Sequence, residues 1–275
     1  MKPARFDYVR AADLAEAHSA LAEYGNDARV IAGGQTLMPM LSMRLVRPKV
    51  VVDIMHLSAL RGIETNGNTI RIGAAVRQAE LLAWPDLAEH LPLLDAALPW
   101  VGHAQTRSRG TVCGSAAHAD PSAEIPLCLL ALDAAIELSS RRGRRRVAAA
   151  EFFTGMMTTS RAENELIEAL HIPARQAGAG YAFKEFGRRH GDFAIVACAA
   201  IVTAANIRLA IGGVADRPVM RDLGAIDGKQ LDEALDAFAW ALDARDDLHA
   251  TARYRRELVR QMGRETIEEA RACRD

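Results

Sequence analysis

Two short runs of small residues constrain this chain more than any other feature of its sequence. The first is Ala32-Gly-Gly-Gln-Thr36, and the second is Gly110-Thr-Val-Cys-Gly-Ser115. In each run, small residues stand where an apolar segment typical of a strand gives way to a turn. Because no bulky side chain shields the backbone there, several N–H groups can converge on one anion. Two such bends in one domain predict a ligand with two linked phosphates, held from both sides, as in a dinucleotide.

Side chains within both bends are consistent with this prediction. Gln35 and Thr36 add hydrogen-bond donors to the first bend, and Thr111 and Ser115 add hydroxyl groups to the second. The sequence contains no G-x-x-x-x-G-K-[ST] run, and no G-x-G-x-x-G follows a predicted strand. This excludes a P-loop enzyme and an ordinary Rossmann domain. Taken alone, the first bend is explained equally well as a tight turn, so the prediction depends on the pair.

Length and charge exclude several classes of protein. At 275 residues the chain can bury a substantial core and is expected to divide into two domains. Its formal net charge is −1, so no global field attracts nucleic acid or an anionic membrane. No apolar stretch is long enough and free enough of charge to span a bilayer, and the first residues lack the apolar segment of a secretory signal. We therefore expect a cytoplasmic protein without a transmembrane segment.

The cysteines argue against an iron–sulfur cluster on this chain. The four are Cys113, Cys128, Cys198 and Cys273, and no two form a C-x-x-C pair. Their spacing matches neither a zinc site nor a cluster. We predict free thiols, with Cys128 and Cys198 as small core residues. Any iron–sulfur chemistry must therefore come from another polypeptide.

Apolar periodicity predicts helices and strands in alternation over most of the chain. Helices are expected at residues 12–24, 77–101 (split by three prolines), 125–132, 231–242 and 247–270, and strands at 28–32, 50–54, 69–75, 134–139, 165–172, 193–203 and 207–212. The arginine-rich run 141–146 is typical of a solvated hairpin tip, with a nucleic-acid patch as the alternative. The small residues 176–180 predict a domain boundary.

Acidic residues follow the second bend at a spacing that suits ligand orientation. Asp120 and Glu124 could accept hydrogen bonds from ribose hydroxyls or from the edge of a flavin ring. The alternative for Asp120 is to cap a helix that starts at Pro121. With His118 the two carboxylates suggest a metal site, but the spacing is not that of a helical zinc motif.

Lys184 opens a run of charges and glycines that ends at Asp192. Such a run is typical of a surface turn. The functional alternative is that Lys184 points into a flavin site, where a cation near the N1–C2=O edge would stabilise the anionic reduced ring.

At the two bends, the sequence resembles the FAD-binding medium subunit of the molybdenum hydroxylases, the carbon monoxide dehydrogenase and xanthine dehydrogenase family. Residues 32–45 read AGGQTLMPMLSMRL, against a family pattern similar to A-G-G-x-[ST]-L-x-P-x-x-x-x-R-L. Residues 111–126 read TVCGSAAHADPSAEIP, against T-[IV]-G-G-[NS]-x-x-x-A-[DS]-P-x-x-[DE]-x-P. Weaker similarities continue in the same order to about residue 245. Cys113 departs from the pattern, since it replaces the first glycine of the usual pair.

The resemblance implies an α+β fold with a two-subdomain FAD-binding domain of the vanillyl-alcohol-oxidase (PCMH) type. That domain would occupy residues 1–175, with subdomains of about 1–55 and 56–175. A smaller C-terminal α+β domain of the CO dehydrogenase flavoprotein type would follow at residues 176–275. No catalytic residue and no metal ligand on this chain is expected. The implied FAD-binding residues are Ile31, Ala32, Gly33, Gly34, Gln35, Thr36, Leu37, Val101, Thr111, Gly114, Ser115, Asp120, Glu124, Ile167 and Lys184.

By the same resemblance, the expected function is electron transfer within a molybdenum hydroxylase. Electrons would pass from [2Fe–2S] clusters on a small partner subunit through FAD to an external acceptor. A large partner subunit would carry the molybdopterin cofactor, and the assembly would be a dimer of heterotrimers. The alternatives are a non-catalytic FAD- or nucleotide-binding module and a stand-alone flavin oxidoreductase. Carbon monoxide, an aldehyde, an N-heterocycle or an aryl-CoA thioester remains open as substrate, and the electron acceptor is open too.

Overall fold

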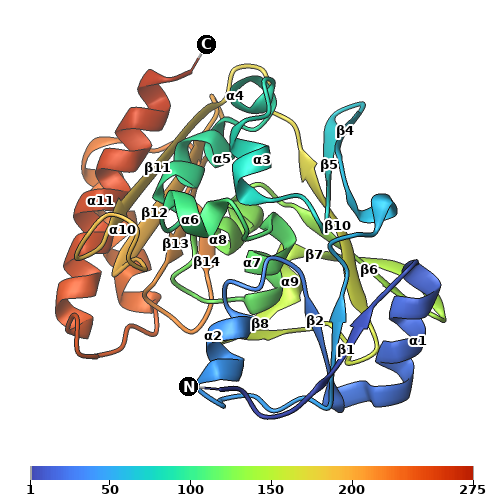
Figure 1. Cartoon of the computed structure of the whole chain (residues 1–275). Coiled ribbons are helices and arrows are strands. Elements are labelled where there is room, and N and C mark those ends of the chain that lie inside the picture. Colours follow the sequence, from blue (N-terminus) through green and yellow to red (C-terminus); the bar gives the residue numbers. More distant parts are fainter. Residues whose placement is uncertain (1, 275) are drawn as a thin grey trace.

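The computed structural model describes residues 2–274, and its N-terminal part is a small parallel sheet flanked by a helix (Figure 1). Strands β1 (Asp7–Arg10), β3 (Val50–Asp53) and β2 (Ala28–Ile31) lie in that order. The central strand begins with three consecutive buried valines, as expected for a strand covered on both faces. Helix α1 (Leu14–Tyr24) packs on this sheet, and its N-cap Asp13 accepts a hydrogen bond from the backbone N–H of Glu16.

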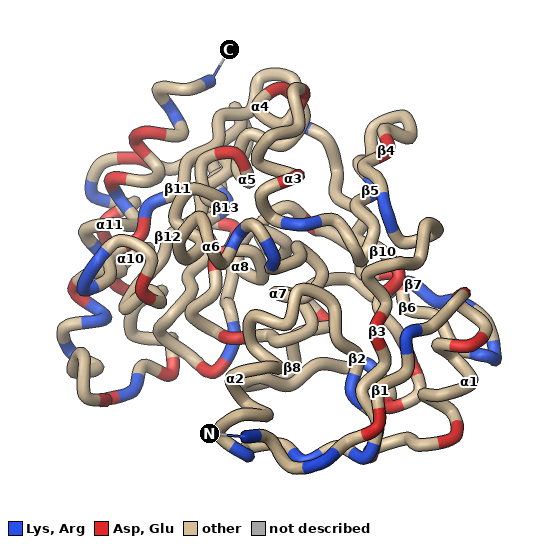
Figure 2. Tube along the Cα trace, viewed as in Figure 1, with Lys and Arg blue, Asp and Glu red and all other residues tan. Residues whose placement is uncertain are grey.

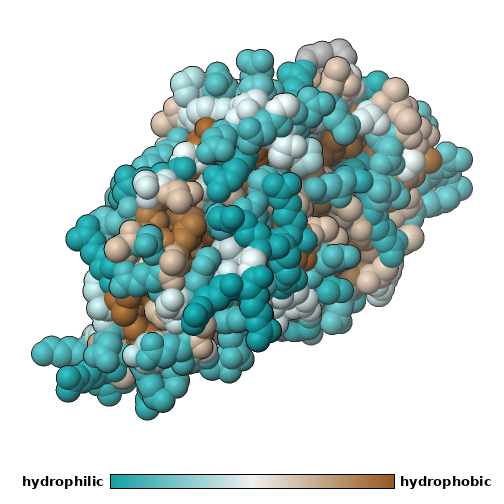
Figure 3. All heavy atoms as spheres, turned by 90° about the vertical axis from the view of Figure 1, so that its right-hand side faces the viewer, coloured by the Kyte–Doolittle hydropathy of each residue, from teal (hydrophilic) through white to brown (hydrophobic). Residues whose placement is uncertain are grey.

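A second, antiparallel sheet has five strands in the order β4-β5-β10-β6-β7. Its bounds are β4 (Ile63–Asn66), β5 (Thr69–Gly73), β10 (Leu166–Pro173), β6 (Ala135–Ser140) and β7 (Gly143–Ala148). The central strand β10 is buried along almost its whole length. The face that carries α1 and the β4–β5 hairpin is mostly hydrophilic, with small hydrophobic areas between the polar side chains (Figure 3).

Short helices connect β5 to β6 and form the middle of the molecule. They are α3 (Gln78–Leu82), α4 (Leu87–His90), α5 (Pro92–Ala97), η3 (Leu98–Trp100), α6 (Ala104–Arg107), α7 (Val112–His118) and α8 (Glu124–Ala131). Prolines divide this region as predicted, since Pro92 begins α5 and Pro99 lies in the first turn of η3. The remaining short elements are η1 (Gly25–Asp27), α2 (Leu37–Ser42), η2 (Ser58–Leu60), α9 (Ala149–Phe152), β8 (Phe153–Gly155) and β9 (Thr158–Thr159).

The C-terminal part is an antiparallel sheet of four strands in sequence order, β11 (Gly180–Phe186), β12 (Val196–Val202), β13 (Ile207–Gly212) and β14 (Val219–Asp222). On one face, α10 (Gly228–Ala241) and α11 (Ala252–Ala272) enclose a separate hydrophobic core. On the other face, α5 and α8 pack against the strands, so side chains such as Phe183 and Ala197 join the larger N-terminal core. The sheet therefore stands between two layers of helices (Figure 1).

The α+β class and most of the predicted elements are confirmed, and two differences affect the region of the predicted site. Strand β11 was not predicted, because its first residues belong to the flexible run 176–180 and its last to a charged run. The second bend was expected to be a loop, whereas residues 112–118 form helix α7, since small residues there allow a helix as readily as a turn. No helix within residues 2–274 is long and apolar enough to cross a membrane.

The arginines of the run 141–146 are divided between the tip of a hairpin and one of its strands. Arg141 and Arg142 form the tip of the β6–β7 hairpin, as predicted, but the last three arginines belong to strand β7 (Figure 2). There Arg144 pairs with Glu168 at 2.8 Å and Arg145 with Glu165 at 2.6 Å. These arginines therefore neutralise carboxylates of the same sheet, which argues against a nucleic-acid patch.

Candidate functional site

The two glycine bends lie in direct contact. A Cβ atom built on Gly33 would stand 2.1 Å from the carbonyl oxygen of Arg109 and 2.7 Å from the Cα of Gly110. No side chain fits into so small a gap, so only glycine allows the first bend to approach the second. Segments almost eighty residues apart in the sequence thus form one small region of exposed backbone.

Unpaired N–H groups follow one another along the first bend. Within residues 2–274, no acceptor receives a hydrogen bond from the backbone N–H groups of residues 33–36. Gly34 has a φ of 70°, a left-handed conformation that turns successive N–H groups toward one side. The Gln35 side chain donates to the carbonyl of Gly33 at 3.2 Å, which leaves the backbone donors free. The first bend therefore has the properties of an anion-binding nest.

Thr111 organises the second bend. It is the N-cap of α7, and its Oγ1 accepts a hydrogen bond from the N–H of Gly114 at 3.0 Å. The hydroxyl proton of Thr111 remains able to donate to a ligand, as does the half-buried hydroxyl of Ser115. A Cβ on Gly114 would lie 2.6 Å from Thr111 Oγ1, so this glycine keeps the cap in place.

Asp120 stabilises the turn between α7 and α8. Its Oδ1 accepts from the N–H of Ser122 at 2.8 Å, while α8 begins only at Glu124, with Ala123 as its N-cap. The prediction that Asp120 caps a helix starting at Pro121 is therefore wrong, because the chain makes an Asx-type turn before the helix starts. Among the described residues, no group of three potential ligands that could hold a metal includes Asp120.

Glu124 is buried at the start of α8, with only 4% of its surface exposed. Burial raises the pKa of its carboxyl to about 7, and the negative charge of Asp120 adds to the shift. The hydrogen bond from its own backbone N–H and the positive charge of Arg107 act in the opposite direction. Burial therefore favours the neutral form of Glu124 much more than it is favoured in an exposed glutamate.

Val101 and Ile167 are apolar side chains of the larger core near the second bend. Val101 follows η3, and the Arg107 guanidinium donates to its carbonyl at 3.0 Å, which ties this segment to α6 just before the bend. Ile167 lies on β10 at a register irregularity, and β10 packs against α7. Both side chains are more than nine-tenths buried, so they can provide apolar contact but no hydrogen bond.

Lys184 does not lie with the other predicted site residues. In the sheet register it pairs with Cys198, which pairs with Ile211, and both of these belong to the C-terminal core. Its Nζ stands 3.3 Å from carboxylate oxygens of both Glu265 and Glu269 on α11. The expectation that Lys184 points into the site is corrected here, because alternation along β11 turns it to the opposite face.

We expect Lys184→Met to leave a bound flavin unchanged. The ion pairs that this variant removes are partly exposed and contribute less than about 1 kcal/mol to stability. The measurement is the absorption spectrum and midpoint potential of the flavin in the variant beside those of the wild-type protein. A clear change in potential would mean that Lys184 reaches the cofactor after all.

Glu185, the next residue, is on the face of the sheet that packs against α5 and α8. It pairs with Ala197, which pairs with Gly212, and a Cβ on Gly212 would be 3.3 Å from the carbonyl oxygen of Pro121. Burial raises the pKa of Glu185 to about 8, and the nearby Glu124 adds to the shift. The sequence analysis missed this residue, since only the pairing register shows which of two neighbouring residues faces inward.

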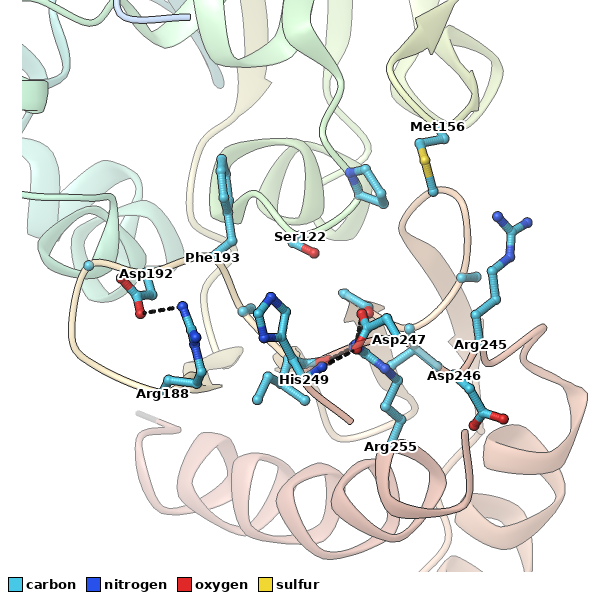
Figure 4. Close-up of a pocket in the computed structure, with 17 residues that line it drawn as sticks. Ser122, Met156, Arg188, Asp192, Phe193, Arg245, Asp246, Asp247, His249 and Arg255 are labelled. Carbon is cyan, nitrogen blue, oxygen red and sulfur yellow. Dashed lines mark hydrogen bonds and ion pairs between the residues drawn. The ribbon is translucent and has the colours of Figure 1, made fainter. Parts of the chain in front are cut away.

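A cavity of about 490 Å³ opens beside the turn at Pro121 and Ser122 (Figure 4). Arg255, 4% exposed, donates to the carbonyls of Ile195 and Gly213 at 2.6 and 2.7 Å and pairs with Asp247. It therefore joins the start of β12 and the end of β13 to the loop before α11. Arg255 could not be singled out from the sequence, because it lies in a helix whose other charged residues are mostly exposed.

Two family profiles match consecutive parts of the chain. Residues 4–175 match the FAD binding domain in molybdopterin dehydrogenase, and residues 181–270 match the CO dehydrogenase flavoprotein C-terminal domain.

Similar proteins cover the chain over its whole length. It is 38% identical to the 6-hydroxypseudooxynicotine dehydrogenase complex subunit alpha of Paenarthrobacter nicotinovorans, over 98% of this chain and 96% of the relative. It is 33% identical to the carbon monoxide dehydrogenase medium chain of Hydrogenophaga pseudoflava, over 98% of each. The fold matches a chain of the H. pseudoflava carbon monoxide dehydrogenase structure that lacks the Mo-pyranopterin moiety, with a TM-score of 0.96 and 32% identity over the full length of both chains.

Proposed function

This chain belongs to the family of FAD-binding medium subunits of the molybdenum hydroxylases, and from that premise we propose how it serves as their flavoprotein. It carries FAD and passes electrons from [2Fe–2S] clusters of a partner subunit to an external acceptor. The observation that supports this role most directly is the contact between Gly33 and the Arg109–Gly110 backbone, beside a row of free N–H groups. Such a cradle suits the diphosphate bridge of a dinucleotide.

Residues of the two bends fit FAD by chemistry as well as by shape. The free N–H groups of residues 33–36 and the hydroxyls of Thr111 and Ser115 supply donors to diphosphate oxygens. Asp120 uses Oδ1 in the turn, while its Oδ2 lies 3.9 Å from His118 Nε2 and can still accept a hydrogen bond from hydroxyl groups of the ligand. Ile31, Ala32, Leu37, Val101 and Ile167 would supply apolar contact and exclude water.

FAD, when bound, accepts electrons singly and releases them singly or in pairs, so the protein needs no catalytic acid or base. The work of this chain is to bind the cofactor, orient it and set its potential. Residues 2–274 contain three buried cysteines and one exposed cysteine, all free, so the clusters belong to a partner.

The partners in this proposal are a large molybdopterin-binding subunit and a small [2Fe–2S] subunit. The names of the relatives as medium chain and complex subunit support a multi-subunit enzyme. We further propose a dimer of heterotrimers in the cytoplasm, and a division of this chain into residues 1–175, with subdomains of about 1–55 and 56–175, and residues 176–275.

Substrate choice lies outside this chain. Relatives named for a nicotine derivative and for carbon monoxide are 38% and 33% identical to it over nearly their whole length. Since proteins of such different substrates share this subunit, the substrate is set by the molybdenum-binding partner.

Purification tests the proposal against its two alternatives. We expect a yellow protein that co-purifies with molybdenum and iron–sulfur partners and whose flavin is reduced by substrate only when they are present. A colourless protein that takes up no added FAD would instead indicate a nucleotide-binding or assembly module. Turnover of an organic substrate by the isolated chain would indicate a stand-alone flavin oxidoreductase.

Gly114→Val is expected to give a folded protein with little FAD. The new side chain would displace Thr111 Oγ1, which lies 2.6 Å from the position of its Cβ, and would obstruct the diphosphate. Loss of the helix cap costs about 1 kcal/mol, which a protein of this size tolerates. Flavin per protein is measured by absorbance, with Ala117→Val on the exposed side of α7 as the control. A Gly114→Val protein with as much flavin as the wild type would show that the second bend does not bind the cofactor.

A further inference from the structure

Glu185 and Glu124 approach each other from two separately built parts of the molecule. Cross-strand neighbours project to the same face of a sheet, so Glu185 shares a face with Ala197 and Gly212. That face meets α8, because a Cβ on Gly212 would lie 3.3 Å from both the Pro121 carbonyl oxygen and Leu127 Cδ2. Glu124 is the first residue of α8 and is almost completely buried at this junction.

Within the described residues 2–274, neither carboxyl group forms a hydrogen bond or ion pair with a cationic side chain. Glu185 Oε2 is buried without a hydrogen-bond partner among residues 2–274, and the hydrogen bond that Glu124 receives comes from its own backbone. Lys184 is on the opposite face, paired with carboxylates of α11. The Arg107 guanidinium, whose positive charge acts to lower the pKa of Glu124, donates its hydrogen bonds to backbone carbonyls at Val101 and Gly102.

Other ionisable groups around the pair do not compensate its charge. The segment of α7 and α8 contributes Asp120 and Cys128, and the pKa of this thiol is raised well above its usual value by burial and by both glutamates. Helix α5, which also packs on β11, carries Asp95. Two carboxylates in such surroundings cannot both be ionised at low cost, and neighbouring carboxyls of this kind share a proton. With pKa values raised to about 7 and about 8, the pair holds at least one proton at neutral pH.

We propose that Glu124 and Glu185 form a proton-binding site beside the flavin, which gains a proton from water when electrons reach the cofactor and releases it when they leave. The proposal rests on the function proposed above. In the uptake step an O–H bond forms between a carboxylate oxygen and a proton supplied by water or buffer, and no electron moves to the carboxyl group. In the release step the same O–H bond breaks and the proton returns to solvent. The pair thus offsets the negative charge that electrons bring to the site.

The consequence is a reduction potential that depends on pH more steeply than the flavin alone would require. At pH values too high for the pair to keep its proton, both groups are carboxylates, and their negative charges lower the reduction potential of the flavin. One additional proton taken up per two electrons adds about 30 mV per pH unit to the slope, since a tenfold change in equilibrium constant corresponds to that potential for a two-electron couple.

The experiment uses the FAD-loaded protein, titrated with redox dyes between pH 6 and pH 9, as wild type, Glu185→Gln and the exposed control Glu233→Gln. We expect the additional slope in the wild type and the control and its loss in Glu185→Gln. Infrared spectra of the oxidised protein should also contain the C=O band of a protonated carboxyl at neutral pH, which disappears at high pH and is weaker in Glu185→Gln. If that variant does not fold, Glu124→Gln provides the same comparison.

Two results would overturn the proposal in different ways. A Glu185→Gln protein that binds FAD and keeps both the wild-type slope and the wild-type carboxyl band would show that the pair binds no proton relevant to the cofactor. A wild-type protein that binds no FAD would overturn the proposed function itself, and the coupling with it.

Discussion

Gly33→Ala is expected to weaken FAD binding severely. The new Cβ would stand 2.1 Å from the Arg109 carbonyl oxygen and 2.7 Å from the Gly110 Cα, and both are backbone atoms that cannot rotate away. The two bends must then separate, so the N–H groups of the first bend no longer meet the donors of the second around one diphosphate. We expect the Kd for FAD to rise by roughly 100-fold or more, which corresponds to about 2.7 kcal/mol of binding free energy.

Stability should change together with flavin content. A tightly bound cofactor stabilises the folded state in proportion to the logarithm of its concentration over Kd, so Gly33→Ala should also lose the rise in Tm that added FAD produces. Flavin absorbance per protein and the melting temperature with and without FAD provide the measurement.

Gly155→Ala is the matched control for this prediction. The nearest atom to its Cβ, Asp216 Oδ2, is 3.6 Å away, an ordinary contact distance, and Gly155 has no positive φ. This variant should retain its flavin. A Gly33→Ala protein with wild-type flavin content would show that the contact between the bends is not part of the cofactor site.

Glycine positions explain why the contact between the two bends could be predicted from the sequence. Gly33 is needed because another backbone segment approaches it too closely for a Cβ atom. That segment is the beginning of the second run of small residues, at 110–115. The inference needed only local composition and the geometry of backbone donors. The two bends do lie in contact, although the second continues into helix α7 instead of a loop, with Thr111 as the helix cap.

Side-chain direction explains why the rest could not be predicted. Lys184 and Glu185 are neighbours in the sequence, and only the pairing of β11 with β12 decides which of them faces α8. A shift of one residue in that register exchanges their positions. A cation was expected on the face toward α8, and the carboxyl group of Glu185 is on that face instead. Arg255 is a second case, since its role depends on carbonyl groups of Ile195 and Gly213, distant in the sequence.

The buried carboxyls also make the free energy of unfolding depend on pH. Their contribution falls as pH rises, whereas that of the salt-bridged acids falls as pH is lowered. Burial raises the pKa of Glu124 to about 7, above its usual value of 4.5, so its neutral form is favoured by folding. Its contribution to stability is therefore fully present below about pH 4.5 and is lost as pH rises to about 7, and Glu185 extends the loss to about pH 8. Paired acids such as Glu165 and Asp222 have lowered pKa values, so their contribution to stability is present throughout this range and is lost only when pH falls below it, through those lowered pKa values.

Glu124→Gln should consequently be more stable than the wild type at pH 8 and about equal to it at pH 4.5. A shift from 4.5 to about 7 corresponds to about 3 kcal/mol, the largest difference expected at pH 8. Urea unfolding at a series of pH values from 4.5 to 8.5 gives the measurement, and a comparison of the two proteins cancels the histidines that titrate in the same range. Glu233→Gln, an exposed residue of α10, should follow the wild type at every pH. If Glu124→Gln also follows the wild type, its carboxyl is ionised in the folded protein, and the shared proton on which the coupling to the flavin depends does not exist.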